Sequence, residues 1–213
     1  MSPLTAIVDD DAATRAGRSV LDVGAECFAA GATFVQLRAK QRSSAWLLEM
    51  AEQLVAMGTP IGARVIVNDR ADVARLAGAA GVHVGQDDLA PADARRIVGA
   101  DRIVGVSTHS VSQLDEALRQ PIDYVAVGPV FGTASKDTGY DAVGLTLVGA
   151  AAARARPRGV GVVAIGGITL ERAADVINAG ATSVAIISDL LSTGDARARV
   201  RQYLDKLGGI SRV

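Results

Sequence analysis

The chain has 213 residues and a formal net charge of −1 at pH 7, which suits one domain with a large apolar core. This balance of charges gives no basic surface for nucleic acid or for an anionic membrane. The longest apolar run, 160–168, is too short to span a bilayer, and a single cysteine, Cys27, excludes an internal disulfide. No secretory leader is visible after Met1, so we expect a cytoplasmic protein; its oligomeric state stays open, with a homo-oligomer as one option.

Short β-branched runs alternate along the whole chain with segments that carry apolar residues at helical spacing. The expected strands are 4–8, 33–37, 65–67, 82–84, 102–106, 123–127, 161–165 and 182–187. The expected helices are 15–30, 43 or 44 through 54, 72–80, one that begins at 90–91, 111–118, 143–154, 170–178 and 195–206. Eight such units without a linker predict one domain, 1–213, with the (β/α)8 TIM-barrel fold. An open doubly wound sheet is the alternative, but no GxGxxG follows the first strand.

Two aspartates follow neighbouring strands of this predicted barrel. Asp69 comes after strand 65–67 and Asp88 comes after strand 82–84. Parallel strands joined by a helix point the same way, so both carboxylates should emerge at the same edge of the sheet. Carboxylates held close together repel each other unless a cation lies between them. Mg²⁺ is commonly bound by one or two carboxylates together with substrate phosphates, so we expect a magnesium site here.

Three basic residues also lie at this edge. Arg38 and Lys40 follow the second strand, and Lys136 lies in the loop after the sixth. Any one of them alone is equally well explained as a solvated charge at the rim. Three of them beside two aspartates indicate a shared anionic partner. A diphosphate ester of about −3, the two aspartates, Mg²⁺ and the three cations would balance in charge.

A second anion site is expected after the last two strands, where Gly166-Gly167 and Ile187-Ser188 occur. Glycines let backbone N–H groups approach phosphate oxygens, and a following helix N-terminus adds positive potential. The alternative is that the two glycines only form a tight turn. Together with Ser188 on the neighbouring strand, they favour phosphate binding.

The remaining reactive residues suggest no protein nucleophile. His83 lies inside a strand and is expected to be packed in the barrel, while His109 either lines the cleft or caps a helix. No Ser/His/Asp or Cys/His arrangement and no zinc-ligand spacing occurs. A Schiff-base lysine remains an alternative, but it would need a lowered pKa, and acids or phosphates beside Lys40 and Lys136 would keep them charged.

Taken together, seven motifs in chain order resemble the thiamine-phosphate synthase family. They are QLRAK (36–40), VNDR (67–70), GVHVGQDD (81–88), GVSTH (105–109), DYVAVGPVF (123–131), SK (135–136) and AIGGI (164–168). Each motif is modest alone, whereas the series is specific and covers most of the chain.

The resemblance implies a Mg²⁺-assisted transferase that joins hydroxymethylpyrimidine diphosphate to hydroxyethylthiazole phosphate, giving thiamine phosphate and diphosphate. It implies that the pyrimidine diphosphate contacts Gln36, Leu37, Arg38, Ala39, Lys40, Asn68, Ser107 and Lys136. Among these, Arg38, Lys40, Ser107 and Lys136 would act in catalysis, with Asp69 and Asp88 as metal ligands. The thiazole phosphate would contact Thr133, Ala134, Ser135, Gly167, Ile187 and Ser188.

The sequence departs from the family pattern at two places. Ser135 stands where the family usually has threonine, which retains the hydroxyl and is expected to retain function. The first strand lacks the aromatic residue often found there. A related thiazole tautomerase, or a barrel that binds a phosphorylated ligand without turnover, are the alternatives; neither needs both the basic cluster and the aspartate pair. We also expect the glycine-flanked loop 132–139 to close over the reacting groups.

Overall fold

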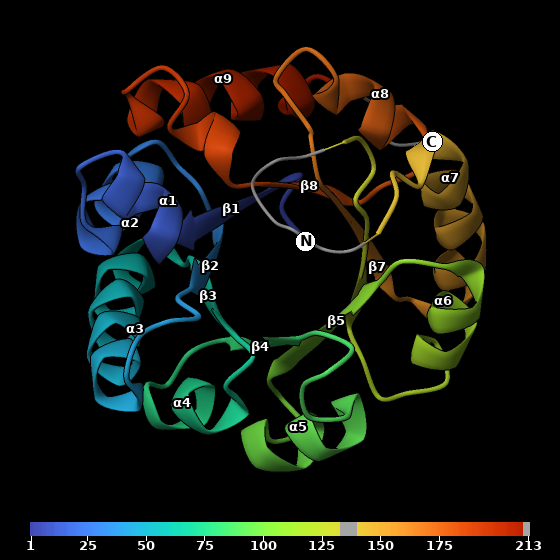
Figure 1. The fold of residues 1–213 in the computed structure, drawn as a ribbon, viewed down its shortest axis with the longest axis horizontal. Coiled ribbons are helices and arrows are strands. Elements are labelled where there is room, and N and C mark those ends of the chain that lie inside the picture. The colour runs from blue at the N-terminus through green and yellow to red at the C-terminus, as the bar shows by residue number, and fades with distance from the viewer. Residues whose placement is uncertain (133–139, 211–213) are drawn as a thin grey trace.

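The computed structural model of the chain describes residues 1–132 and 140–210. Eight parallel strands close into one barrel in chain order, with helices around it (Figure 1). The sequence-based prediction of a (β/α)8 barrel is therefore confirmed. The strands are β1 (Leu4–Asp9), β2 (Phe34–Arg38), β3 (Arg64–Asn68), β4 (Gly81–Val84), β5 (Ile103–Thr108), β6 (Tyr124–Val127), β7 (Gly161–Ile165) and β8 (Ser183–Ile186).

The helices form a ring outside the strands, as Figure 1 shows. They are α1 (Asp10–Arg15), α2 (Val20–Ala29), α3 (Ser44–Gly58), α4 (Ala71–Leu76), α5 (Pro91–Val98), α6 (Val111–Ala117), α7 (Gly144–Ala155), α8 (Ala173–Asn178) and α9 (Ala196–Gly208). Three short 3₁₀ turns accompany them, η1 (Thr59–Ile61), η2 (Arg156–Arg158) and η3 (Ser188–Leu190). None of the helices in the described ranges is long and apolar enough to cross a membrane.

Several expected helices differ from those observed, including the second, which runs on from residue 54 to Gly58. The segment 15–30 does not form one helix. Asp9 caps α1, and Gly17, at φ +68°, ends this helix. Ser19 then caps α2. The helix expected at 72–80 stops at Leu76, because Gly78 takes a left-handed conformation at φ +67°. The helix expected from residue 170 begins only at Ala173.

The apolar core has two layers, which follow from the alternation of side chains along each strand. Side chains that point outward pack under the helices. Those that point inward fill the barrel, and they include Ile7, Phe34, Ile66, Tyr124 and Val163. Thr5 and Ser183 add a buried hydroxyl pair, 2.9 Å apart. The barrel is thus a packed support, and its open end is free to carry polar groups.

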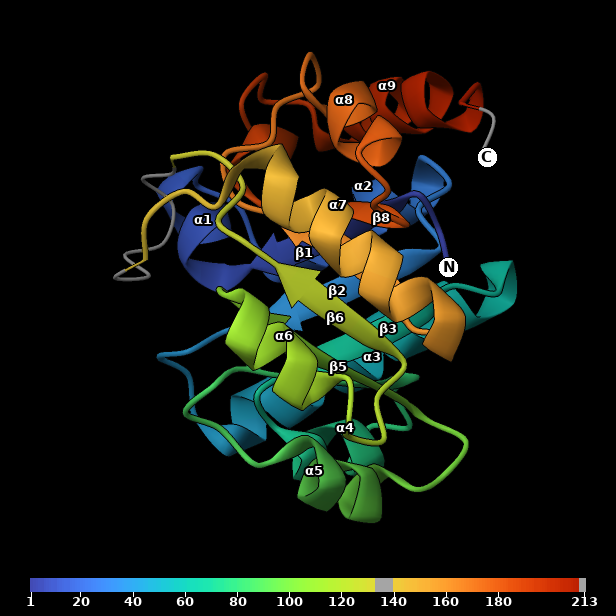
Figure 2. The ribbon, with the colours of Figure 1, turned by 90° about the vertical axis from the view of Figure 1, so that its right-hand side faces the viewer.

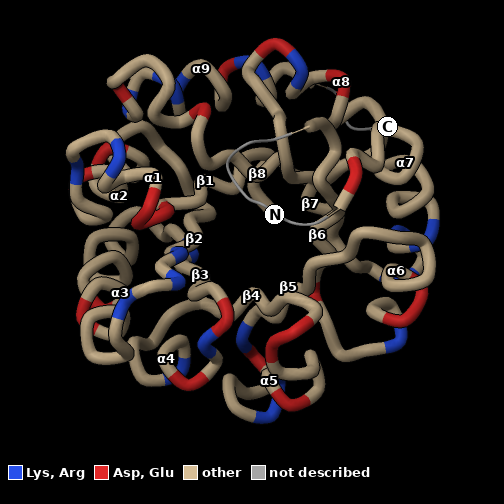
Figure 3. Tube along the Cα trace, in the orientation of Figure 1, with Lys and Arg blue, Asp and Glu red and all other residues tan. Residues whose placement is uncertain are grey.

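The strand arrows give the barrel two unlike ends. Figure 2 shows them pointing away from the side where the N-terminus lies. In Figure 3, charged residues gather where β1, β2 and β3 end, whereas the trace around β7 is mostly tan. The carboxyl ends of the strands therefore carry a charged side and a largely uncharged side.

Candidate active site

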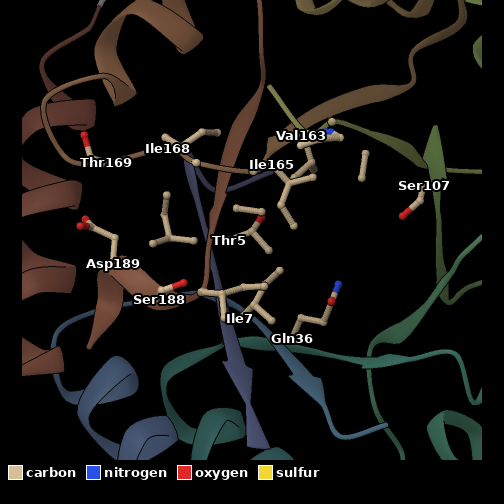
Figure 4. Close-up of a pocket in the computed structure, with 18 of the residues that line it drawn as sticks. Thr5, Ile7, Gln36, Ser107, Val163, Ile165, Ile168, Thr169, Ser188 and Asp189 are labelled. Carbon is tan, nitrogen blue, oxygen red and sulfur yellow. The ribbon is translucent and has the colours of Figure 1, made fainter. Parts of the chain in front are cut away.

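A cavity of about 400 Å³ lies at the carboxyl ends of the strands. Gln36 and Ser107 stand at one side of it, Ser188 and Thr169 stand at the other, and Ile7 and Ile165 lie between them (Figure 4). This arrangement suits a ligand, or two ligands side by side, with polar groups at both ends and a flat apolar part in the middle.

The aspartates predicted to bind metal do come together beyond the ends of β3 and β4. Burial and, after it, a hydrogen bond with Asp88 raise the pKa of the Asp69 carboxyl to about 6, and nearby Lys40 opposes the shift. The backbone N–H of Gly85 donates to Oδ2 of Asp88 at 2.7 Å, which fixes the second carboxylate. Two half-buried carboxyl groups in hydrogen-bond contact form a pair of oxygen donors that a dication would bridge.

Asp69 also has an unusual backbone. Its φ is +65°, a left-handed conformation that non-glycine residues seldom adopt. Its N–H donates to the carbonyl of His83 on β4 at 2.7 Å, and this bond holds the turn in place. Asp69 combines a strained backbone with a second carboxylate close by, and both features cost stability. This indicates that Asp69 is placed to bind a ligand and not to stabilise the fold.

Lys40 lies within reach of this pair. Its Nζ is 3.3 Å from Oδ2 of Asp69, and its side chain is 49% exposed. An exposed ion pair of this kind is weak, so the ammonium group is free to turn toward an incoming anion.

Arg38 is fixed far more firmly than Lys40. It forms an ion pair with Asp9, its partner in the β1–β2 register, and the two side chains are only 12% and 5% exposed. Asp9 also accepts a hydrogen bond from the N–H of Ala12 at 2.9 Å, as the N-cap of α1. The Arg38 Nε is buried, and no partner for it lies within the described residues. A buried donor of this kind indicates a missing acceptor, for which a phosphate oxygen is suitable.

His83 and Tyr124 support the Ser107 side of the cavity. The Nε2 of His83 is 2.9 Å from Oγ of Ser107, and its Nδ1 is 3.0 Å from the hydroxyl of Tyr124. The two rings are stacked. Burial raises the pKa of the Tyr124 phenol, so this hydroxyl remains protonated. His83 is packed in the barrel as expected, and it also lines the cavity.

The opposite side of the cavity includes a tight glycine turn. Gly166 and Gly167 have φ values of +100° and +63°, and a Cβ on Gly167 would lie 2.5 Å from the carbonyl oxygen of Gly132. The tight turn alone accounts for both glycines. Since α8 begins at Ala173, no helix starts directly after the turn, contrary to expectation. Phosphate binding here therefore depends on the N–H groups of the turn and on neighbouring Ser188.

The structure places the remaining predicted residues as follows. Gln36 is buried in the middle of β2, and Asn68 is buried at the end of β3. Leu37 is buried on β2, Ala39 follows that strand, and Ile187 lines the cavity. Thr133, Ala134, Ser135, Lys136 and the loop 132–139, apart from Gly132, lie outside the described residues.

Arg172 and Asp189 of the cavity were not identified from the sequence, whereas His109 was predicted either to line the cleft or to cap a helix. His109 lines the cavity, bonds through Nδ1 to the carbonyl of Gly128, and stacks on Tyr140 with ring centroids 3.9 Å apart. Arg172 and Asp189 line the side near Ser188. His109 was left between two roles, and its place in a strand-end motif was the one available signal.

Comparison with known proteins shows the family to which the chain belongs. The family model that describes thiamine monophosphate synthase matches residues 4–190. A thiamine-phosphate synthase from Koribacter versatilis (strain Ellin345) is 45% identical over 183 residues, covering 85% of this chain and 83% of its own. This chain belongs to the thiamine monophosphate synthase family. The resemblance drawn from the seven motifs is thereby confirmed.

Other members of the thiamine monophosphate synthase family and solved structures extend the match. A thiamine-phosphate synthase from Chloroflexus aurantiacus is 41% identical over 192 residues, which is 90% of this chain and 87% of its own. The structure of thiamine phosphate pyrophosphorylase from Pyrococcus furiosus superposes with a TM-score of 0.86 at 26% identity, covering 97% and 96% of the two chains. Phosphoribosylanthranilate isomerase from Thermotoga maritima, at 13% identity and a TM-score of 0.63 over 99% of this chain and all of its own, shares the fold alone.

Proposed function

We propose how this member of the thiamine monophosphate synthase family carries out its reaction. The enzyme is a transferase that joins hydroxymethylpyrimidine diphosphate to hydroxyethylthiazole phosphate, with thiamine phosphate and diphosphate as products. The bond between the pyrimidine methylene and the diphosphate oxygen breaks, and the thiazole nitrogen forms the new bond to that methylene. The electrons of the broken bond leave with the diphosphate, so no nucleophile from the protein is needed.

The diphosphate belongs at the charged ends of β2, β3 and β4, next to the cavity, whose lining includes Gln36 of β2 but not Arg38, Lys40, Asp69 or Asp88. Asp69 and Asp88 would hold Mg²⁺, and their paired oxygens fit this hard cation. When bound, Mg²⁺ neutralises charge that develops on the leaving diphosphate. Arg38 presents a buried N–H without a partner in the described part of the chain, and Lys40 contributes a movable ammonium group. Lys136 is proposed for the same task on the strength of its motif.

The pyrimidine belongs between Gln36 and Ser107. Ser107 is held by His83, and Gln36 contributes to the same buried group through Tyr124. Polar atoms fixed in this way can orient a ring without moving during the reaction. Asn68, at the end of β3, faces the same region by its place in the barrel.

The thiazole phosphate belongs at the opposite side, on the turn of Gly166 and Gly167 and on Ile187 and Ser188. The apolar side chains between the two ends keep water away from the electron-poor methylene carbon. One observation carries this assignment: the cavity has two different polar ends separated by an apolar middle. A single phosphorylated ligand would not require both ends.

This observation also weighs against the alternatives. A thiazole tautomerase or a binding barrel needs the phosphate side of the cavity but not the aspartate pair with Lys40. We further propose a cytoplasmic location, because both substrates carry charges that do not cross a bilayer unaided. A homo-oligomer stays a prediction that light scattering would check.

One assay tests the proposal. Purified protein is mixed with both substrates and Mg²⁺, and diphosphate and thiamine phosphate are followed with and without a chelator. We expect both products in equal amounts, and their loss when the chelator is present. Turnover that is unchanged by the chelator would refute the metal site, and binding of thiazole phosphate without any turnover would favour the two alternatives.

A further inference from the structure

The side of the cavity proposed to bind phosphate contains an acid. Asp189 comes directly after Ser188, lines the cavity beside it, and has a side chain only 15% exposed (Figure 4). A carboxylate this close to a phosphate would repel it, and low exposure would strengthen that repulsion because little water screens it. The site therefore needs a means of cancelling this charge.

Helix α9, which lies outside the barrel, supplies the cancelling group. Arg199 donates from Nε to Oδ2 of Asp189 and from a terminal nitrogen to Oδ1, both at 3.0 Å. Tyr203, one turn further along α9, donates its hydroxyl to Oδ2 as well. Burial and the neighbouring Asp189 raise the pKa of the Tyr203 phenol, so the hydroxyl remains a donor. The Arg199 side chain is 12% exposed, and the bidentate geometry is the strong form of this pair.

The same pair also fixes the backbone of the proposed phosphate site. Asp189 is the middle residue of η3 (Ser188–Leu190), and its carbonyl accepts a hydrogen bond from the hydroxyl of Ser192 at 2.9 Å. Holding the Asp189 side chain against α9 thus holds the turn that begins with Ser188. Arg199 does not line the cavity, so its effect on a ligand must pass through Asp189.

We propose that Arg199 is a positioning residue for the phosphate subsite. By binding both oxygens of Asp189, it cancels the charge of that acid and keeps the Ser188 turn in place, so that the phosphate of the thiazole substrate meets a neutral pair. This inference rests on the proposed placement of the thiazole phosphate at Gly167 and Ser188.

The test compares Michaelis constants for the two substrates. In Arg199→Met, the KM for thiazole phosphate rises about tenfold, because the buried charge of Asp189 is exposed to the ligand. The KM for the pyrimidine diphosphate and kcat change less than about twofold, since neither depends on this end of the cavity. The matched control is Arg201→Met, an exposed arginine on the same helix, which leaves all three values unchanged.

A second substitution separates the charge of Asp189 from the shape of the turn. Asp189→Asn in the Arg199→Met background restores the KM for thiazole phosphate to within about threefold of the wild-type value. Arg199→Lys keeps the positive charge, so its KM for thiazole phosphate should also stay within about threefold of the wild-type value. A KM that is unchanged in Arg199→Met, or a double variant as impaired as Arg199→Met alone, would overturn the proposal. Melting curves of every variant identify any loss of folding.

Ser188→Ala, measured in the same series, separates a failure of the proposed phosphate site from a failure of the proposed role of Arg199. If it leaves the KM for thiazole phosphate unchanged, the phosphate site itself has been placed wrongly. If it raises this KM while Arg199→Met does not, the site stands and only the role of Arg199 is overturned.

Discussion

The site at the ends of β2–β4 and the site at the ends of β7–β8 are both proposed to bind phosphate groups, but they consist of different kinds of residues. The first has Arg38, Lys40 and an aspartate pair that suits a dication at its strand ends, beyond the residues that line the cavity itself. The second presents a glycine turn, Ser188 and Arg172, and its acid, Asp189, is paired with Arg199. A leaving diphosphate gains charge as its bond breaks, whereas the thiazole phosphate keeps the same charge throughout.

This difference explains the distribution of charged side chains. Groups that bind more strongly as charge develops lower the barrier, while groups that bind a constant charge only improve affinity. Substitutions at β2–β4 should therefore lower kcat, and substitutions at β7–β8 should raise the KM for thiazole phosphate.

The largest effect is expected for Asp69→Asn. Loss of one carboxylate weakens the proposed Mg²⁺ site, and we expect kcat to fall by roughly 1000-fold at fixed Mg²⁺. The measurement is a Mg²⁺ titration of turnover for the variant and the wild type. An unchanged titration curve would remove Asp69 from the metal site and would erase the contrast between the two sides.

Lys40→Ala is expected to have the next largest effect. Its ammonium group is within 3.3 Å of Asp69 and is exposed enough to reach the leaving group, so kcat should fall about 30-fold. Lys206→Ala, an exposed lysine on α9, is the matched control and should leave kcat unchanged. A fall in affinity for thiazole phosphate, with kcat preserved, would show that Lys40 acts on the thiazole phosphate and not on the leaving diphosphate.

Gly167→Ala tests the other side. The new Cβ would meet the Gly132 carbonyl at 2.5 Å, so the turn must shift and the KM for thiazole phosphate should rise about tenfold. Gly62→Ala is the matched control, because Gly62 has a similar φ of +67° but open space around it. Gly62→Ala should lower the stability of the fold through the same backbone strain, and it should leave the KM for thiazole phosphate unchanged. If kcat fell in Gly167→Ala with no change in KM, the proposed division of roles would be wrong.

The smallest expected effect is on stability, and it also belongs to Asp69. Its pKa is raised from 3.8 to about 6 in the folded protein, so ionisation destabilises the fold progressively above pH 3.8, and the loss is complete above about pH 6. Asparagine carries no charge and tolerates φ +65° well. Asp69→Asn should therefore be more stable than the wild type by about 1–2 kcal/mol at pH 8, with the charge-dependent part lost near pH 4. Urea unfolding at both pH values measures this; a variant that is less stable at pH 8 would contradict it.

The sequence was sufficient to predict the barrel and the strand ends that carry the site. Strand and helix periods differ, and parallel strands present their carboxyl ends on one side, so Asp69 and Asp88 could be brought together without coordinates. The pairing of Arg38 with Asp9 could not be predicted, because it depends on the register of β1 against β2. The contact of His83 with Tyr124 also could not be predicted, because it passes over Gly105 of β5 and depends on the register of β4, β5 and β6.

Local conformation was also beyond the sequence. The left-handed backbone of Asp69 could not be singled out from its residue type, because aspartate adopts this conformation more often than most residues but still at only a small share of its positions. Asp189 and Arg199 are ten residues apart and lie on different elements, so their pairing needed the orientation of α9 against η3.

The most direct test of the two-sided account is calorimetric titration of each substrate separately, with Mg²⁺ and with a chelator. We predict that removing Mg²⁺ weakens binding of the pyrimidine diphosphate by about tenfold or more, and that it changes binding of the thiazole phosphate by less than about twofold. Equal weakening of both substrates, or of the thiazole phosphate alone, would contradict the assignment of metal and diphosphate to one side and of phosphate to the other.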